Sequence, residues 1–323
     1  MLPWLPWLLA SFLAAVYFFF LNLQAHHHHR RRRGLPPGPR PLPLLGNLHL
    51  LGDHPHRSLA RLAQTHGPLI SLRLGAVTTV VASSPAAARE FLQRHDAVFA
   101  SRSVPDAVGG AHAKNSVVWL PNSPRWRALR KVMARDLLAP HRLDAPELQR
   151  LRRYKVDTSS NTVEWAMAEL LQNPVSMSKV CNELERVIGS GKNIEESHIS
   201  QLPYLQAVVK ETFRLHAPAA FLLPRQDIWA MGRDANVWSE PEKFMPERFL
   251  EKVVDFKGGD FDLIPFGAGR RICPGMPLAM LNQFKWKLPI DVERNGVDMT
   301  EKFGVTLIKA VPLCAIATPI NLS

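Results

Sequence analysis

The feature that most constrains this chain is an uncharged apolar run at its start. No residue from Leu2 to Leu23 is charged, and about 20 apolar residues suffice for a helix to cross the hydrocarbon core of a bilayer. The basic residues follow the run instead of preceding it, and no clear small-residue cleavage site is present, which is typical of an uncleaved anchor rather than a secretory signal. The sequence therefore predicts that residues 1–24 form a transmembrane helix.

The residues after this run predict on which side of the membrane the body of the chain lies. Arg30 to Arg33 form a basic cluster, and the positive-inside rule keeps such a cluster in the cytoplasm. We interpret His26 to His29 as a solvated stretch rather than a metal site, because four adjacent imidazoles lack the partners that orient metal ligands. Prolines fix the following backbone in extended conformations. Residues 25–46 are therefore predicted to form a basic, proline-rich hinge.

The composition of the chain excludes several classes of protein for the body, residues 47–323. With 323 residues, 46% hydrophobic and 21% charged, the chain is neither disordered nor a disulfide miniprotein. Its three cysteines form no CxxC pair, which argues against a zinc finger and fits a reducing compartment. The net charge of +12 is spread along the chain outside Arg30–Arg33. This spread favours an anionic membrane or an acidic protein partner over nucleic acid.

Hydrophobic periodicity predicts a mainly helical body with little sheet. Ile70 to Val81 is rich in β-branched residues around Gly75 and Ala76, which indicates a β-hairpin. Prolines and glycines are frequent from Ala217 onward, so that part is expected to be irregular and ordered by tertiary contacts or a bound cofactor. Helices are expected over residues 84–95, 124–138, 158–171, 175–188 and 202–216.

The most informative stretch is the glycine-rich loop around Cys273. Residues 266–275 read FGAGRRICPG, and glycines let a backbone bend closely around a flat ligand. Arg270 and Arg271 favour the thiolate form of the neighbouring cysteine and can pair with carboxylates. From the composition of the loop alone, a thiolate that holds a metal and an ordinary buried cysteine in a turn are both open interpretations.

The pattern F-x-x-G-x-R-x-C-x-G in this loop resembles the haem-binding loop of the cytochrome P-450 monooxygenases. The resemblance implies the fold of that family, mainly α-helical with small β-sheets, and haem (iron-protoporphyrin) as the cofactor. It makes Cys273 the axial iron ligand and Arg271 a contact of a haem propionate. The other pattern residues, counted with the haem-binding positions, are Phe266, Gly269 and Gly275.

Two further motifs agree with this resemblance. Glu211 and Arg214 lie three residues apart and so share one helix face. On their own they fit a surface ion pair, but the resemblance implies a buried salt-bridged cluster with Arg248 that braces the haem-binding core. Trp126 and Arg130 lie one turn apart. A basic amphipathic helix would explain them, whereas the resemblance assigns both to a haem propionate.

The segment that begins at Asp157 is similar to the acid–alcohol step of the family's long central helix. The resemblance makes the Asp157 carboxylate and the Thr158 hydroxyl a proton relay to iron-bound dioxygen. Small residues precede this step in the family, but Tyr154, Lys155 and Val156 stand here. Asp157 or Thr158 could equally cap a helix that starts at this point, and both interpretations stay open.

The chain also departs from the family in length. Only residues 131–156 separate Arg130 from Asp157, where the family has several helices, including those that roof the substrate pocket. Leu223–Arg225 runs almost directly into Asp227, which skips a sheet segment, and the helix after Cys273 is clipped near Leu281. The chain is therefore predicted to form an incomplete version of the fold, with its haem face open to water.

The leading functional hypothesis follows from the resemblance. The anchor, the hinge and residues 298–306 are similar to plant microsomal members of the geraniol hydroxylase group. This implies an endoplasmic reticulum monooxygenase that inserts one oxygen atom of O2 into a small apolar, terpenoid-like substrate. Electrons would come from NADPH through a separate reductase that docks near Arg127, Arg130 and Lys131.

Two alternatives compete with this hypothesis. One is a shortened, non-catalytic relative or a gene-model fragment that binds haem poorly or not at all. The other is a nucleic-acid-binding protein, which rests only on Arg30–Arg33 and the net charge; tight, salt-sensitive binding to duplex DNA would support it.

Overall fold

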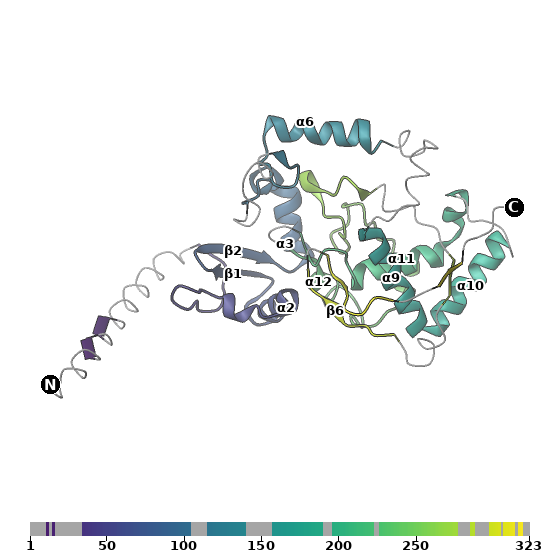
Figure 1. Cartoon of the computed structure of the whole chain (residues 1–323), viewed down its shortest axis with the longest axis horizontal. Coiled ribbons are helices and arrows are strands. Elements are labelled where there is room, and N and C mark those ends of the chain that lie inside the picture. The colour runs from purple at the N-terminus through teal and green to yellow at the C-terminus, as the bar shows by residue number, and fades with distance from the viewer. Residues whose placement is uncertain are drawn as a thin grey trace. The chain divides into compact units, whose positions relative to one another are not determined.

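The protein is described from a computed structural model. The chain folds into two compact units, residues 1–82 and 83–323 (Figure 1). Within the described residues no helix has the length and apolar character needed to cross a membrane, and the predicted anchor lies almost wholly outside them. The structure describes residues 11–12, 15–16, 34–104, 115–139, 157–189, 196–222, 226–276, 285–287, 297–304, 306–313 and 316–318.

The first unit contains the predicted β-hairpin. A 3₁₀ turn, η1 (Leu48–Leu50), and helix α2 (Pro55–His66) precede strands β1 (Leu69–Leu74) and β2 (Val77–Ala82). The strands are antiparallel with Leu74 opposite Val77, so residues 75 and 76 form a two-residue turn. Gly75 has φ of 61°, a value that favours glycine and matches the turn that such hairpins use. The hairpin prediction is confirmed.

The five helical stretches that the sequence predicted in the second unit are present, and the short α4 (Asp96–Phe99) is an additional helix that was not predicted. Serines begin two of them: Ser84 Oγ accepts a hydrogen bond from the Ala87 N–H, and Ser123 Oγ accepts one from the Trp126 N–H. A proline follows each serine at the first helical position, which is the preferred arrangement. The elements are α3 (Pro85–Arg89), η2 (Glu90–Arg94), α4 (Asp96–Phe99), α6 (Pro124–Val132), η4 (Met133–Leu137), α9 (Asp157–Gln172), α10 (Pro174–Ile188) and α11 (Pro203–Leu215).

Helices α9, α10 and α11 pack on one another (Figure 1). Leu170, Val180, Tyr204 and Val208 form a buried cluster among them. Glu183 of α10 is also buried, and its two carboxylate oxygens accept the backbone N–H groups of Tyr204 and Leu205 at 2.9 Å each. The carboxylate therefore satisfies donors that the first turn of α11 would otherwise leave unpaired.

The part of the chain beyond α11 has short elements joined by irregular backbone, as predicted. Strand β3 pairs with β4, β5 with β8, and β6 with β7, all antiparallel. The elements beyond α11 are β3 (Phe221–Leu222), β4 (Gln226–Asp227), α12 (Ile228–Met231), α13 (Arg248–Glu251), the 3₁₀ helix η6 (Gly269–Arg271), β5 (Lys285–Lys287), β6 (Glu301–Lys302), β7 (Ile308–Lys309) and β8 (Ile316–Thr318). A further 3₁₀ helix, η5 (Glu196–Gln201), lies just before α11.

A buried ion-pair cluster orders part of this irregular region. Glu211 and Arg214 of α11 form two parallel N–H···O bonds of 2.8 Å, and Arg248 Nε lies 3.2 Å from Glu211 Oε1. The remaining Arg214 donors bind the carbonyl oxygens of Gly232, Pro241 and Lys243. Both members of the pair have fully buried side chains. One helix face thus fixes three backbone points of a segment that lacks regular secondary structure.

We expect Asp227 to make folding less favourable as pH rises. Its side chain is fully buried, and burial raises the pKa of Asp227 to about 7, although the Ala230 N–H and Arg233 act to lower it. An unfolded Asp titrates near pH 4. Between these values the folded state therefore holds a proton that the unfolded state has lost. Stability should fall by on the order of 4 kcal/mol across this range and level off above it.

Replacing Asp227 by asparagine should flatten this pH dependence, because the amide keeps an oxygen that can accept the Ala230 N–H but does not ionise. The free energy of unfolding in urea, measured from pH 4 to 8, provides the comparison. The control is Asp234→Asn, since Asp234 accepts the Asn236 N–H in an exposed turn. Equal slopes for wild type and Asp227→Asn would contradict the expectation.

Candidate haem site

A cavity of about 330 Å³ lies in the second unit, and Cys273 lines it. The Cys273 side chain is exposed and forms no disulfide. Apolar residues from separate segments share the lining, among them Val117, Met133 and Pro218. The cavity thus places one thiol in a largely apolar space, as ligand-binding pockets commonly do.

Local backbone geometry holds the cysteine loop in this position. The Cys273 N–H donates to the Phe266 carbonyl at 2.8 Å, which closes the loop on itself. Gly269 has φ of 64°, and a Cβ there would overlap the carbonyl oxygen of Leu92. The Phe266 ring packs edge-on against Phe213 of α11, with centroids 5.3 Å apart. The loop is therefore packed against both η2 and α11, and only glycine fits at position 269.

Arg271 connects the loop to the segment that precedes α6. Its guanidinium donates to the carbonyl oxygens of Ala100, Val117 and Leu120 at 2.7, 3.1 and 2.5 Å. The same group lies 4.2 Å from the centroid of the Trp126 ring, within the range of a cation–π contact. Arg271 therefore joins residues about 150 to 170 positions away in the sequence.

Two further guanidinium groups line the cavity. Arg130 Nη2 donates to the Ile272 carbonyl at 2.8 Å, and Arg102 Nη1 donates to the Val118 carbonyl at 3.0 Å. Arg102 Nε is buried and has no hydrogen-bond partner among the described residues. Among the described residues, no carboxylate forms an ion pair with Arg102, Arg130 or Arg271.

Burial lowers the pKa of all three guanidinium groups, and neighbouring cations lower it further for Arg102 and Arg271. Burial and then the charges of Arg102 and Arg130 lower the pKa of Arg271 to about 10. Burial, followed by Arg130, lowers the pKa of Arg102. Burial also lowers the pKa of Arg130, although Cys273 acts to raise it. Because like charges repel, this arrangement favours an anion at the cavity.

The structure brings together most of the residues that the sequence singled out. Trp126 and Arg130 line the cavity with Phe266 and Arg271. The Trp126 indole N–H donates to the Val117 carbonyl at 3.0 Å. A Cβ on Gly275 would lie 3.8 Å from Cys273 Sγ. The side chains of Asp157 and Thr158, where α9 begins, lie outside the described residues.

Sequence reasoning missed Arg102 and Thr162, both of which line the cavity. Neither stands in a local pattern that distinguishes it from other polar residues. Arg102 comes to the site through the backbone contacts of Arg271, and Thr162 comes to it through the packing of α9. A single sequence shows neither of these long-range contacts.

The residues of the cavity fit haem. Haem needs one axial donor, a flat apolar space and cations for two carboxylates. The exposed Cys273 thiol, the apolar lining and the three guanidinium groups supply these needs. The unpartnered, buried Arg102 Nε adds a donor for which the described residues offer no acceptor. Fold and site together define a haem-thiolate protein.

Comparison with known proteins places the chain in a family. The family model described as Cytochrome P450 matches residues 36–149, 156–228 and 227–286, so the chain belongs to the cytochrome P450 family. Members of this family are haem-thiolate monooxygenases, and its cofactor is haem.

The chain is similar to plant relatives in sequence. It is 35% identical to Geraniol 8-hydroxylase of Catharanthus roseus, over 87% of this chain and 93% of that protein. It is 34% identical to Cytochrome P450 76C1 of Arabidopsis thaliana, over 87% of this chain and 92% of that protein. The first alignment extends over 463 positions, whereas the chain has 323 residues. The relative therefore has internal segments that this chain lacks, in line with the predicted shortening.

Solved structures show the same fold. A zebra fish cytochrome P450 structure with progesterone superposes with a TM-score of 0.65 at 20% identity. The match covers 82% of this chain and 99% of that one. The predicted fold class, mainly α-helical with small sheets, is confirmed for the body of the chain.

Proposed function

We propose that this chain is a monooxygenase that inserts one oxygen atom of O2 into a small apolar, terpenoid-like substrate. The observation that carries the proposal is the shared cavity, in which the Cys273 thiol, three guanidinium groups and apolar side chains meet. Two relatives bear the name Geraniol 8-hydroxylase, which supports a terpenoid alcohol as the first substrate to test.

Each residue of the cavity has a proposed role. Cys273 holds the haem iron through its thiolate, and Trp126, Arg130 and Arg271 orient the haem carboxylates. Arg102 joins them through its buried Nε. Haem held by a thiolate supplies activation of dioxygen for insertion of oxygen into a C–H bond. The apolar lining offers a surface on which a small apolar substrate can bind.

Further roles lie at the edges of the cavity. Phe266, Gly269 and Gly275 shape the cysteine loop, and the Glu211–Arg214–Arg248 cluster braces the core behind it. Asp157 and Thr158, at the start of α9, are proposed to form a proton relay that would serve oxygen activation once haem is bound.

Electrons are proposed to come from NADPH through a separate reductase. Arg127 and Lys131 are exposed on α6, whereas Arg130 is half-buried and binds the cysteine loop. The docking surface is therefore centred on the two exposed residues, and Arg130 belongs to the cavity. An acidic patch on the reductase would pair with these cations, so the rate of reduction should fall as salt increases.

The proposed setting is the endoplasmic reticulum membrane. Residues 1–24 would anchor the chain in a single pass, and Arg30–Arg33 would keep the body in the cytoplasm. Fractionation of cells that express the full chain tests this proposal. The chain should stay with microsomes in carbonate and should leave them in detergent.

The function is tested by incubating the full chain, loaded with haem, with a plant reductase, NADPH and geraniol. A hydroxylated product that requires NADPH is expected. The dithionite-reduced sample under carbon monoxide should also show the red-shifted Soret band of thiolate-bound haem. A sample that shows this band but forms no oxidised product from a terpenoid panel would contradict the proposed activity and support a non-catalytic relative.

A further inference from the structure

Two walls of the cavity come from segments that are distant in the sequence. Thr162 of α9 lines one part, and Pro218 and Ala219, just after α11, line another. Their separation determines how much room an apolar ligand has. The contacts between α9 and the 216–219 segment therefore contribute to the shape of the cavity.

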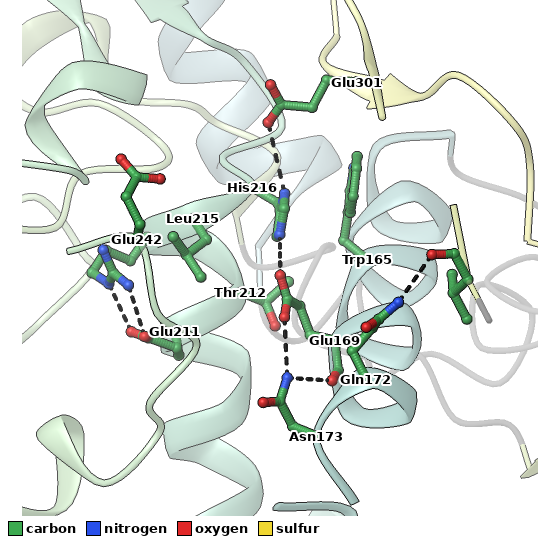
Figure 2. A network of polar contacts seen from close by, with 12 residues as sticks. Trp165, Glu169, Gln172, Asn173, Glu211, Thr212, Leu215, His216, Glu242 and Glu301 are labelled. Carbon is green, nitrogen blue, oxygen red and sulfur yellow. Dashed lines mark hydrogen bonds and ion pairs between the residues drawn. The ribbon is translucent and has the colours of Figure 1, made fainter. Parts of the chain in front are cut away.

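The first of these contacts passes through His216. Its Nε2 lies 2.7 Å from Glu169 Oε1, and its Nδ1 lies 3.9 Å from Glu301 Oε1 (Figure 2). The imidazole stacks on Trp165, with ring centroids 4.0 Å apart and planes 3° from parallel. Glu169 and Trp165 both belong to α9, while His216 stands two residues before Pro218. Burial lowers the pKa of His216 below its ordinary value, which favours the neutral imidazole, although Glu169 acts to raise it. His216 thus joins the two segments through one buried hydrogen bond and one ring stack.

The second contact passes through the backbone of Leu307. Its carbonyl accepts hydrogen bonds from Asn161 Nδ2 at 2.8 Å and from Trp165 Nε1 at 3.4 Å. Its N–H donates to the Pro218 carbonyl at 2.9 Å. One peptide segment therefore bridges α9 and the wall residue Pro218. Leu307 and Asn161 are 1% and 5% exposed, so water does not compete with these bonds.

The charges around His216 hold the contacts in one arrangement. Glu169 reaches it from α9, Glu301 from β6 and Arg233 from the turn after α12, where Arg233 Nη2 lies 4.0 Å from Glu301 Oε1. Trp165, the ring that stacks on His216, also has a cation over it: Lys309 Nζ of β7 lies 4.9 Å from its ring centroid. Moving a member of a buried polar network away from its partner is unfavourable, because the group then stays buried without a hydrogen bond to offset its lost hydration.

We propose that His216 and Asn161 are positioning residues that set the width of the cavity between Thr162 and the Pro218–Ala219 wall. They thereby determine how tightly a small apolar substrate binds, without touching haem or substrate themselves. The part of the proposal that concerns substrate rests on the proposed monooxygenase function. The part that concerns the wall rests only on the contacts described above.

Two variants of the full chain test the wall, with a matched control. His216→Ala removes the hydrogen bond to Glu169 and the ring stack on Trp165. Asn161→Ala removes only the amide that donates to the Leu307 carbonyl. The control, Gln172→Ala, removes an equivalent bond on the same helix, since Gln172 Nε2 donates to the Val297 carbonyl at 3.0 Å in an exposed position (Figure 2). If His216→Ala does not fold, Asn161→Ala alone decides the outcome.

The first measurement is hydrogen exchange, which needs no haem. The Leu307 amide and residues 217–222 should exchange at least about tenfold faster in both variants, the effect expected for losing one buried hydrogen bond. The control should match wild type. Wild-type exchange in a folded Asn161→Ala protein would overturn the proposal.

The second measurement is the dissociation constant of geraniol, taken from the shift of the Soret band on titration. We expect it to rise about tenfold in the two variants and to stay constant in the control, while the reduced carbon monoxide band is unchanged. An unchanged dissociation constant with the thiolate band intact overturns the inference about substrate. A wild-type protein without that band instead overturns the proposed function, and hydrogen exchange still decides the role of the two residues in the wall.

Discussion

Replacing Cys273 by serine is expected to abolish the red-shifted Soret band of the reduced protein under carbon monoxide, together with all NADPH-dependent product. The change exchanges one sulfur atom for oxygen and leaves the backbone bond from the Cys273 N–H to the Phe266 carbonyl in place. A serine hydroxyl at neutral pH is protonated and donates electron density to iron far more weakly than a thiolate does. The effect should therefore be a complete loss of the spectroscopic signature.

The same substitution should leave the fold intact. The Cys273 side chain is exposed to the cavity, and exposed substitutions away from caps and networks usually change stability by less than about 0.5 kcal/mol. Cys181→Ser is the matched control, because Cys181 is a free, exposed cysteine on α10 that does not line the cavity. A Cys273→Ser protein that kept the red-shifted band, or a Cys181→Ser protein that lost it, would rule out Cys273 as the iron ligand.

Local signals in the sequence were sufficient to predict most of the helices. Ser123 followed by Pro124 marks the start of α6, and Ser84 followed by Pro85 marks the start of α3, because capping and φ restriction act within one turn. The spacing of Glu211 and Arg214 likewise places both on one face. The β-hairpin was predictable because its turn and its strands are adjacent in the chain.

Contacts between distant segments could not be predicted in this way. Arg102 has no local pattern that distinguishes it. It lies two residues after Ala100, whose carbonyl Arg271 binds together with those of Val117 and Leu120. His216 was expected only as the end of a helix. Its partners Glu169 and Glu301 come from α9 and β6, and nothing in the sequence around position 216 specifies them.

Replacing Arg214 by methionine is expected to destabilise the second unit by about 3–5 kcal/mol, the usual result of removing one partner of a buried ion pair. Methionine preserves much of the volume but leaves Glu211 as a buried carboxylate without its two 2.8 Å bonds. Lysine should be nearly as damaging, because its ammonium group cannot supply the planar fork that pairs with both oxygens of Glu211. The free energy of unfolding in urea measures the effect.

The control for Arg214→Met is Lys252→Met in the same region. Lys252 Nζ lies 2.6 Å from Asp262 Oδ2, but half of the lysine side chain is exposed, and such surface pairs contribute less than about 1 kcal/mol. If both variants lost a similar free energy of unfolding, the buried Glu211–Arg214 pair would be no more stabilising than an exposed pair.

A double substitution separates the charge of Glu211 from the other contacts of Arg214. Glu211→Leu combined with Arg214→Met removes the unpaired buried carboxylate, so the double variant should be more stable than Arg214→Met alone. It should not recover the stability of wild type, because Arg214 also binds the carbonyl oxygens of Gly232, Pro241 and Lys243. These acceptors stay buried or partly buried without a donor. Full recovery would show that the backbone bonds contribute nothing, and that the irregular segment is ordered by its apolar contacts alone.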